Sequence, residues 1–219
     1  MRKNYAAWYL CPIIVLLPSL IVWGSGILID DYKDGLSPKW EEKSFKGKTR
    51  YQVTREDNQL CIKATSRASA SALYYKIEYD LKDYPILTWL WKVDHVLSKG
   101  DAHTKQGDDY AARVYVVFPS LIFWRTKALN YIWANKLPRG KAIPNSYTSN
   151  AMMIAVESGS TYAGKWRGVR RNVFEDYRRY FGEDPPKVGA IAIMTDTDNT
   201  GQMAIAWYGP IQILPASNR

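Results

Sequence analysis

Acidic and amide side chains are concentrated in two short stretches of this sequence. MTDTDNTG carries Asp196, Asp198 and Asn199 between two apolar runs, and GDDYAARVYVVF carries Asp108 and Asp109 ahead of alternating apolar residues. Carboxylate and amide oxygens are ligands for calcium, and two carboxylates about 5–10 Å apart can hydrolyse a glycosidic bond. The residue types therefore allow a metal site, a polar binding site or a hydrolytic centre around Asp108 and Asp196.

The Asp-x-Asp-x-x-Gly spacing that begins at Asp196 resembles the first half of an EF-hand loop. An EF-hand requires a bidentate Glu at its twelfth position, and counting from Asp196 places Trp207 there. The stretch is therefore not an EF-hand. It is either a turn-rich hairpin, or a structural calcium site in which Asp196 and Asp198 are completed by ligands distant in the sequence.

Arg113 begins RVYVVF, a stretch whose other residues suit a buried strand. A buried guanidinium is unfavourable unless it is paired, so we expect a carboxylate partner from the two acidic stretches. The candidate partners are Asp108, Asp109, Asp196 and Asp198. The pair either ties two loops together or forms the floor of a polar pocket.

Nucleophilic catalysis and cysteine chemistry have little support. The sequence has two histidines, His95 and His103, and no Gly-x-Ser-x-Gly elbow. The polar stretch at 100–110 is either a solvated loop or part of a metal site. Cys11 and Cys61 are expected in different environments, which argues against a disulfide, and two cysteines are too few for a cysteine-based zinc site.

Apolar and polar residues alternate with a period of two from about residue 45 onward, as in half-buried strands. Strands are expected at 45–53, 60–66, 70–81, 86–96, 112–118, 128–134, 151–158, 188–195 and 203–214. The pattern predicts an all-β fold, an antiparallel jelly-roll-like β-sandwich. One short helix is expected at 172–182, with Asn172 as its N-cap and Gly182 at its end.

Residues 6–29 carry no charge, and roughly 20 apolar residues are enough to cross a bilayer as a helix. We therefore expect an uncleaved membrane anchor at 1–29, a linker at 30–44 and a β-sandwich domain at 45–219; a cleaved signal peptide is the alternative. Arg2 and Lys3 precede the apolar segment. The positive-inside rule then predicts a single-pass protein of a bacterial inner membrane, with a cytoplasmic N-terminus and a periplasmic domain.

Two further stretches suggest surface contacts. The apolar and basic cluster within 119–127 is either a strand extension or small buried helix, or a loop at the membrane interface. Its interface candidates are Leu121, Ile122, Phe123, Trp124 and Arg125. The basic stretch at 165–171 is either a solvated face or a contact for anionic lipid or an acidic partner.

Composition limits the partners only loosely. The net charge of +9 permits contact with acidic glycans or anionic lipid head groups without selecting one. The sequence contains 9 Trp and 16 Tyr, and their rings would also suit a sugar-stacking platform that includes Trp133 and Trp207.

Several motifs occur together in a fixed order: SASALYYKI, PILTWLWKV, GDDYAARVYVVF, YIWAN, RNVFEDYRRYFGEDPP and AIAIMTDTDNTGQMAIAWYGPI. In this combination the sequence resembles, over about 38–214, a bacterial exported family known only as domain of unknown function 3047. The resemblance implies a sandwich like those of galactose-binding and carbohydrate-binding modules, and no established activity. The motif residues it carries over are Asp108, Asp109, Arg113, Trp133, Asn135, Asp196, Asp198 and Asn199. Pro210 and the expected anchor depart from the family pattern.

The sequence thus predicts a membrane-anchored periplasmic module that binds a ligand without catalysis, with carbohydrate as the leading class. An accessory subunit of a larger membrane complex is the first alternative, and a carboxylate-dependent hydrolase is the second. Expected partners are the lipid bilayer, through the N-terminal helix, and either carbohydrate or other membrane-complex subunits. No nucleic-acid partner is expected, and the cofactor considered is a structural calcium ion.

Overall fold

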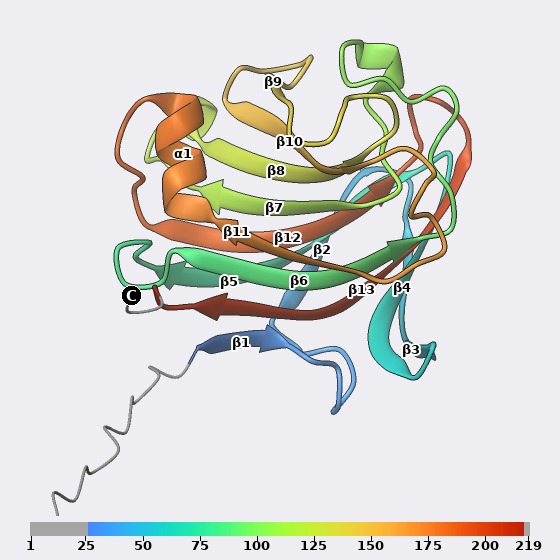
Figure 1. Cartoon of the computed structure of the whole chain (residues 1–219), viewed down its shortest axis with the longest axis horizontal. Helices are drawn as coiled ribbons and strands as arrows, with labels where there is room; N and C mark the ends of the chain where they lie inside the picture. The colour runs from blue at the N-terminus through green and yellow to red at the C-terminus, as the bar shows by residue number, and fades with distance from the viewer. Residues whose placement is uncertain (1–25, 217–219) are drawn as a thin grey trace, which may run out of the picture.

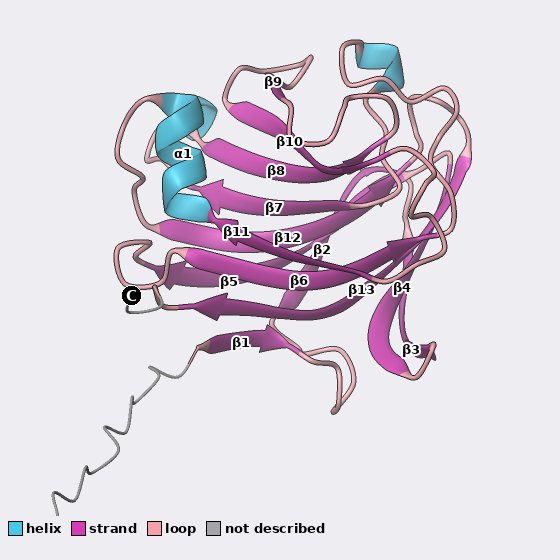
Figure 2. Cartoon of the chain, viewed as in Figure 1, coloured by secondary structure: helices cyan, strands magenta, loops and turns pink. Residues whose placement is uncertain are grey.

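A computed structural model describes residues 26–216, which form two stacked β-sheets with one short helix at one end (Figures 1 and 2). The six-stranded sheet has the order β11 (Arg167–Asn172), β6 (Ile86–Val93), β13 (Met203–Leu214), β4 (Gln59–Arg67) and β3 (Arg50–Glu56), with β1 (Ile27–Asp30) also paired to β13. The seven-stranded sheet has the order β2 (Trp40–Lys46), β5 (Ala70–Tyr79), β12 (Val188–Asp196), β7 (Arg113–Phe118), β8 (Lys127–Ala134), β10 (Ala151–Ser158) and β9 (Ala142–Pro144). The all-β sandwich predicted by the sequence is therefore confirmed.

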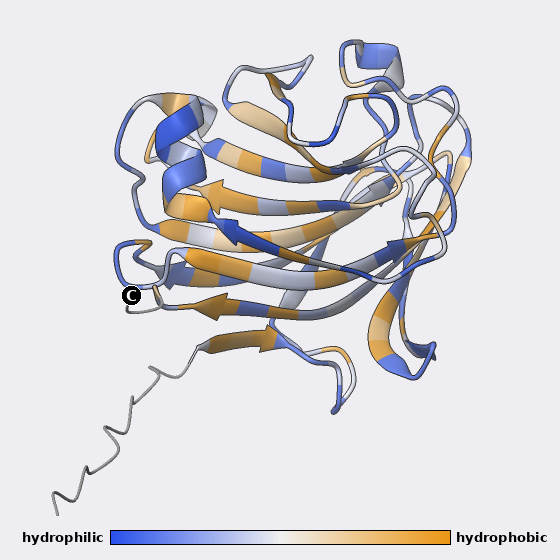
Figure 3. Cartoon of the chain, in the orientation of Figure 1, coloured by the Kyte–Doolittle hydropathy of each residue, from blue (hydrophilic) through white to orange (hydrophobic). Residues whose placement is uncertain are grey.

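Strand alternation places one side chain set between the sheets and the other outside. On β7, Val114, Val116 and Phe118 belong to the core between the sheets, so Arg113 and Tyr115 lie on the outer face of the seven-stranded sheet. Hydrophobic colour is concentrated on the strands, and helix and loops are largely hydrophilic (Figure 3). This alternation decides which polar residues can form a site on the outer face.

Eight of the nine expected strands appear close to their predicted limits. The exception is the expected strand at 45–53, and its prediction as a single strand is wrong. Gly47 adopts a positive φ of 62° and turns the chain there. The residues before it lie in β2 of one sheet and those after it in β3 of the other. Glycine reaches this left-handed conformation without steric penalty, so a corner between the sheets forms where alternation alone predicted continuity.

The sandwich begins earlier than the sequence indicated. Strand β1 pairs with β13, and the Asp30 carboxylate accepts hydrogen bonds from Trp40 Nε1 at 2.9 Å and the Ser37 amide at 3.1 Å. The linker at 30–44 and the end of the anchor at 27–29 are thus corrected: these residues belong to the domain. An apolar strand that follows an apolar segment without a polar break cannot be separated from it by composition.

Residues 1–25, which hold most of the expected anchor, lie outside the described residues. Within residues 26–216, no helix combines the length and the apolar character needed to span a membrane.

One strand pair departs from the antiparallel prediction. β10 runs parallel to β8, with Ala151 opposite Ala128 and Ser158 opposite Ala134. Parallel neighbours need a crossover connection rather than a tight hairpin, and residues 135–150 supply it, including the short β9 that pairs back on β10. Period-two alternation does not report strand direction, so this crossover could not be predicted from the strand pattern.

Helix α1 (Val173–Phe181) confirms the predicted helix and its caps. The Asn172 side chain accepts the amide of Glu175 at 3.1 Å, and Gly182 ends the helix in the left-handed region with φ 73°. The Tyr177 ring packs on Phe118, with centroids 4.6 Å apart. The helix therefore closes one end of the sandwich (Figure 1).

The stretches at 119–127 and 165–171, for which the sequence allowed alternatives, have a defined conformation. Residues 123–125 form a short 3-10 helix, η2 (Phe123–Arg125), and Leu121 and Trp124 beside or within it are strongly exposed. A buried helix or strand extension at 119–127 is therefore wrong. The basic stretch forms β11, an edge strand paired with β6.

Candidate functional site

Arg113 and Asp196 form a buried ion pair on the outer face of the seven-stranded sheet. Arg113 is the first residue of β7 and Asp196 is the last of β12, its hydrogen-bonded neighbour. Arg113 Nε donates to Asp196 Oδ1 at 2.8 Å, and Nη2 contacts Oδ2. Only 5% and 3% of the two side chains are exposed. The expectation that a carboxylate from the acidic stretches neutralises Arg113 is confirmed.

The turn before Tyr110 packs against this pair. Arg113 Nη2 donates to the Asp108 carbonyl, Nη1 lies 3.7 Å from Asp108 Oδ1, and the Tyr110 ring centroid lies 4.3 Å from the guanidinium carbon. Gly107 allows this approach, because a Cβ there would lie 2.5 Å from the amide nitrogen of Asp101. The stretch GDDY therefore needs its glycine to bring Asp108 onto Arg113.

Asp109 fastens the two acidic stretches together. Its Oδ2 accepts the amide of Thr200 at 2.6 Å, and its Oδ1 accepts the amide and the side-chain Nδ2 of Asn199, each at 3.3 Å. Backbone donors satisfy a buried carboxylate well because they cannot be lost by side-chain rotation. The predicted proximity of the two stretches is thus achieved by direct hydrogen bonds.

A cleft of about 470 Å³ lies beside the ion pair, on the same outer face. Its polar lining comes from Asp108, Arg113, Asn130, Asn145, Asp196 and Asp198, and its aromatic lining from Phe45, Tyr115 and Tyr147. A concave site that combines apolar surface with a few convergent polar groups is the usual form of a small-molecule site.

Two acceptor oxygens among the cleft-lining residues are buried and have no hydrogen-bond partner among the described residues. They are Oδ1 of Asp108 and Oδ1 of Asn130, whose residues are 6% and 1% exposed. The other ends of these side chains are engaged: Asp108 Oδ2 accepts from Asn145 Nδ2 at 2.8 Å, and Asn130 Nδ2 contacts Met153 Sδ at 3.2 Å. An unsatisfied buried acceptor costs about 1–3 kcal/mol, so both side chains keep hydrogen-bonding capacity that the described residues leave unused.

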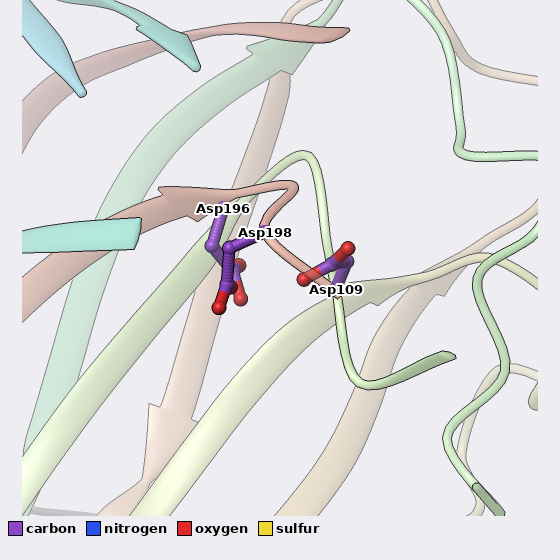
Figure 4. Close-up of side chains that lie close together, drawn as sticks. All are labelled: Asp109, Asp196 and Asp198. Carbon is purple, nitrogen blue, oxygen red and sulfur yellow. The ribbon is translucent and has the colours of Figure 1, made fainter. Parts of the chain in front are cut away.

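One carboxylate oxygen from each of Asp109, Asp196 and Asp198 lies within 4.8 Å of the other two (Figure 4). Asp196 and Asp198 lie side by side, and Asp109 faces them from the neighbouring loop (Figure 4). The structure therefore brings together the two residues predicted to bind calcium and adds Asp109 as a third oxygen donor. Arg113 already supplies one positive charge to this group.

The carboxylates of this cluster repel one another because they lie close together and are largely shielded from water. Burial raises the pKa of Asp196 to about 8, and the charges of Asp109 and Asp108 add to this effect, whereas Arg113 opposes it. Burial and the charge of Asp109 also raise the pKa of Asp198, which is half-buried. The cluster therefore takes up a proton at a higher pH than isolated aspartates do.

Three predicted ligand residues lie away from the cleft. Trp133 is fully buried in the core, 5.8 Å from the Trp91 ring, so it is not available to a ligand. Asn135 holds a loop, since its Oδ1 accepts the Leu97 amide and its Nδ2 donates to the Asp109 carbonyl, both at 2.8 Å. Trp207 belongs to the six-stranded sheet, 7% exposed beneath Lys92.

Five of the predicted ligand residues line the cleft: Asp108, Arg113, Asp196, Asp198 and Asn199. Asp109 does not line it but holds the adjacent loop through the Thr200 amide. Sequence reasoning missed five further polar or aromatic lining residues: Phe45, Tyr115, Asn130, Asn145 and Tyr147. Asn130 could have been found, because it is a polar residue within an apolar strand, as Arg113 is. Nothing in the sequence placed Tyr147 there, since its loop reaches the cleft only through the parallel crossover.

The fold and the cleft define a β-sandwich protein with a polar, aromatic-lined binding face. Residues 38–212 match the model of a family described as a protein of unknown function, DUF3047. The chain belongs to this family, and the resemblance seen in the sequence is confirmed. No curated protein matches the chain.

Solved structures with distant similarity include the K1 cleaved adhesin domain of Lys-gingipain from Porphyromonas gingivalis W83, at 15% identity and a TM-score of 0.45, covering 89% of this chain and 100% of that one. The xylan-binding CBM22-1 domain of Paenibacillus barcinonensis Xyn10C has 10% identity and a TM-score of 0.42, covering 89% and 98%. A Bauhinia forficata lectin in complex with GalNAc has 13% identity and a TM-score of 0.44, covering 89% and 100%. These similarities are too distant to assign a ligand to this chain.

Proposed function

We propose that this protein is a non-catalytic binding module whose ligand is a carbohydrate held in the cleft beside Arg113. The observation that carries the proposal is the cleft itself, whose lining combines the polar groups of Asp108, Arg113 and Asn130 with three aromatic rings. A sugar offers several hydroxyl groups on one small ring, and these groups suit a cleft lined by acidic, amide and guanidinium side chains.

The aromatic lining supports the same ligand class. Tyr147 is 56% exposed and Phe45 is 54% exposed, and both border the cleft. The C–H face of a sugar packs on an aromatic ring while its hydroxyls contact polar groups. Acceptors in the floor and aromatic rings at the rim therefore match the two faces of a carbohydrate.

Binding is favoured over hydrolysis by the condition of the carboxylates. Asp196 is 2% exposed and both of its oxygens contact Arg113, while Asp109 accepts three hydrogen bonds from the adjacent loop. A glycosidase needs an acid and a base or nucleophile that reach the scissile bond from both sides. These aspartates instead hold the walls of the cleft in place.

A glycan array probed with the full chain, purified in an uncharged detergent, tests the proposal. Wild type should bind one class of glycans, and Tyr147→Ala should reduce the signal because it removes the most exposed ring at the cleft. Tyr162→Ala is the matched control, an exposed tyrosine outside the cleft lining. Binding by neither wild type nor control, or an equal loss in both variants, would reject the carbohydrate proposal.

The membrane attachment belongs to the same proposal. Residues 6–25 contain no charge and are preceded by Arg2 and Lys3, which supports a single-pass anchor with its N-terminus in the cytoplasm and the sandwich in the periplasm. Because β1 starts at Ile27, the proposed anchor ends directly at the domain. Replacing residues 1–25 with a cleavable signal should release the domain from membranes, and retention in the membrane fraction would contradict the anchor.

A second function, as an accessory subunit of a membrane complex, is supported by the surface around η2. Leu121 is fully exposed and Trp124 is 77% exposed, an unusual exposure for large apolar side chains on a domain with a full core. Extraction in mild detergent should recover partner proteins with wild type and lose them with Trp124→Ser. Recovery of the same partners with the variant would exclude this surface as the contact.

A further inference from the structure

A second cleft, of about 290 Å³, lies between β10 of the seven-stranded sheet and β11, an edge strand of the six-stranded sheet, and is remote in the sequence from the acidic stretches. Strand β10 forms one wall, and β11 and α1 form the other. Its charged lining is Arg139, Arg170, Arg171, Arg179 and Glu157. Three separate segments therefore contribute arginines to the lining of one hollow: the crossover after β8, the edge strand β11 and the helix α1.

Some of the charged side chains at this cleft form ion pairs that connect its walls. Glu157, 2% exposed at a bulge of β10, accepts from Arg167 Nε at 3.0 Å and lies 3.9 Å from Arg139 Nη2. Arg171 donates to Asp176 with its Nε at 2.9 Å. These contacts link β10 to β11 and β11 to α1, and they fix the walls of the cleft.

The other two arginines are not used in this way. Arg170 and Arg179 are exposed, line the cleft and have no ion-pair partner among residues 26–216. Glu157 balances only one of the two arginines that approach it. The cleft lining therefore has a net positive charge, and the ion pairs of Glu157 and Asp176 hold its walls in place.

Planar guanidinium groups bind tetrahedral oxyanions through paired N–H donors. Charged residues on an edge strand also prevent strands from pairing between molecules, but that role does not require arginines from β11, α1 and the crossover to converge. We propose that the cleft lined by Arg139, Arg170 and Arg179 is a phosphate-binding site, independent of the carbohydrate cleft. The phosphate is either a free anion or the phosphodiester of a lipid head group.

Calorimetric titration of the full chain with inorganic phosphate, in micelles of an uncharged detergent, tests the site. Wild type should bind one phosphate, and Arg170→Gln with Arg179→Gln should weaken binding by at least about tenfold, because each lost charge-assisted hydrogen bond contributes on that scale. Both side chains are exposed and unpaired, so the double variant should keep the wild-type melting temperature.

A charge-matched control separates a built site from general attraction. Arg55→Gln with Arg178→Gln removes the same charge from exposed arginines outside the cleft, and Arg178 is the helical neighbour of Arg179 paired to Asp184 at 3.2 Å. The control should bind phosphate like wild type. Equal weakening in the two double variants, or no phosphate binding by wild type, would overturn the proposal.

Competition then identifies the source of the phosphate. Micelles doped with phosphatidylglycerol should displace inorganic phosphate if the site takes a lipid head group, and micelles doped with phosphatidylcholine, whose phosphate is screened by its own cation, should displace less. Full retention of inorganic phosphate in both mixtures identifies a free anion as the ligand. Either result keeps the site and assigns its ligand.

Discussion

Arg113 and Asp196 face each other diagonally across the β7–β12 pair, since the residue directly opposite Arg113 is Met194. Diagonal neighbours two residues apart are within reach of a long side chain. The guanidinium therefore extends across the sheet, closes on the end of β12 and leaves Tyr115 and Asn130 beside it as cleft lining. One ion pair connects the acidic loops to the sheet and shapes the binding face.

Removing Arg113 should destabilise the protein because Asp196 would remain buried without its counter-ion. We expect Arg113→Met to lower the free energy of unfolding by about 3–5 kcal/mol, measured by urea denaturation. The double variant with Asp196→Leu should recover most of that loss, since neither buried charge remains. A loss below about 1 kcal/mol in the single variant would show that water reaches the pair.

Replacing Asn130 should separate ligand binding from stability. Its Oδ1 has no hydrogen-bond partner among the described residues, so Asn130→Leu should not lower the free energy of unfolding while it weakens glycan binding. Asn135→Leu is the matched control, because both ends of Asn135 are hydrogen-bonded at 2.8 Å and its loss should cost about 1–3 kcal/mol. If both variants lost similar stability, the acceptor of Asn130 would not be free in the folded protein.

Calcium should stabilise the fold through the Asp109, Asp196 and Asp198 cluster. Three carboxylates meet beside one buried guanidinium, that of Arg113, so about 10 mM calcium, saturating for a weak extracellular-type site, should raise the melting temperature by a few degrees. A chelator should reverse the shift, and Asp198→Asn should abolish it. An unchanged melting temperature in wild type would mean that Arg113 and retained protons suffice as counter-charge.

Cys61 should be inert in the folded protein at neutral and mildly alkaline pH. Burial raises its pKa to about 11, so at about pH 8 the reactive thiolate is scarce. A Cys11→Ser variant leaves one thiol to follow with a chromogenic disulfide reagent: slow reaction when native and fast reaction in denaturant are expected. Rapid native labelling would contradict the burial of β4 at this position.

The sequence anticipated most of the sandwich because alternation directly reports which residues are half-buried. It also anticipated the Arg113 pair, since a charge in an apolar strand needs a partner. Trp133 shows the limit of such reasoning: an aromatic side chain in an alternating strand faces either the core or the outside, and only the position of the other sheet decides. Asn130 and Trp133 lie on the same strand, and alternation places Asn130 on the outer face and Trp133 on the inner face.

The edge strand β11 and the start of the domain at Ile27 were not predicted, for a different reason. Arg167 and Arg170 read as a solvated stretch because their side chains dominate the local pattern, whereas β11 is held by backbone pairing with β6. Ile27 to Ile29 were assigned to the apolar segment because a strand that completes a sheet can be as apolar as a membrane span. In both cases the deciding contacts are made by residues distant in the sequence.

The parallel pairing of β8 with β10 places Asn145 and Tyr147 on a connection that starts and ends on the same sheet. Insertions or substitutions in 135–150 should therefore alter one wall of the proposed carbohydrate cleft without altering strand register on the other side. The same crossover carries Arg139 to the phosphate cleft. Relatives that differ in this segment should differ in ligand preference at both clefts while they keep the same sandwich.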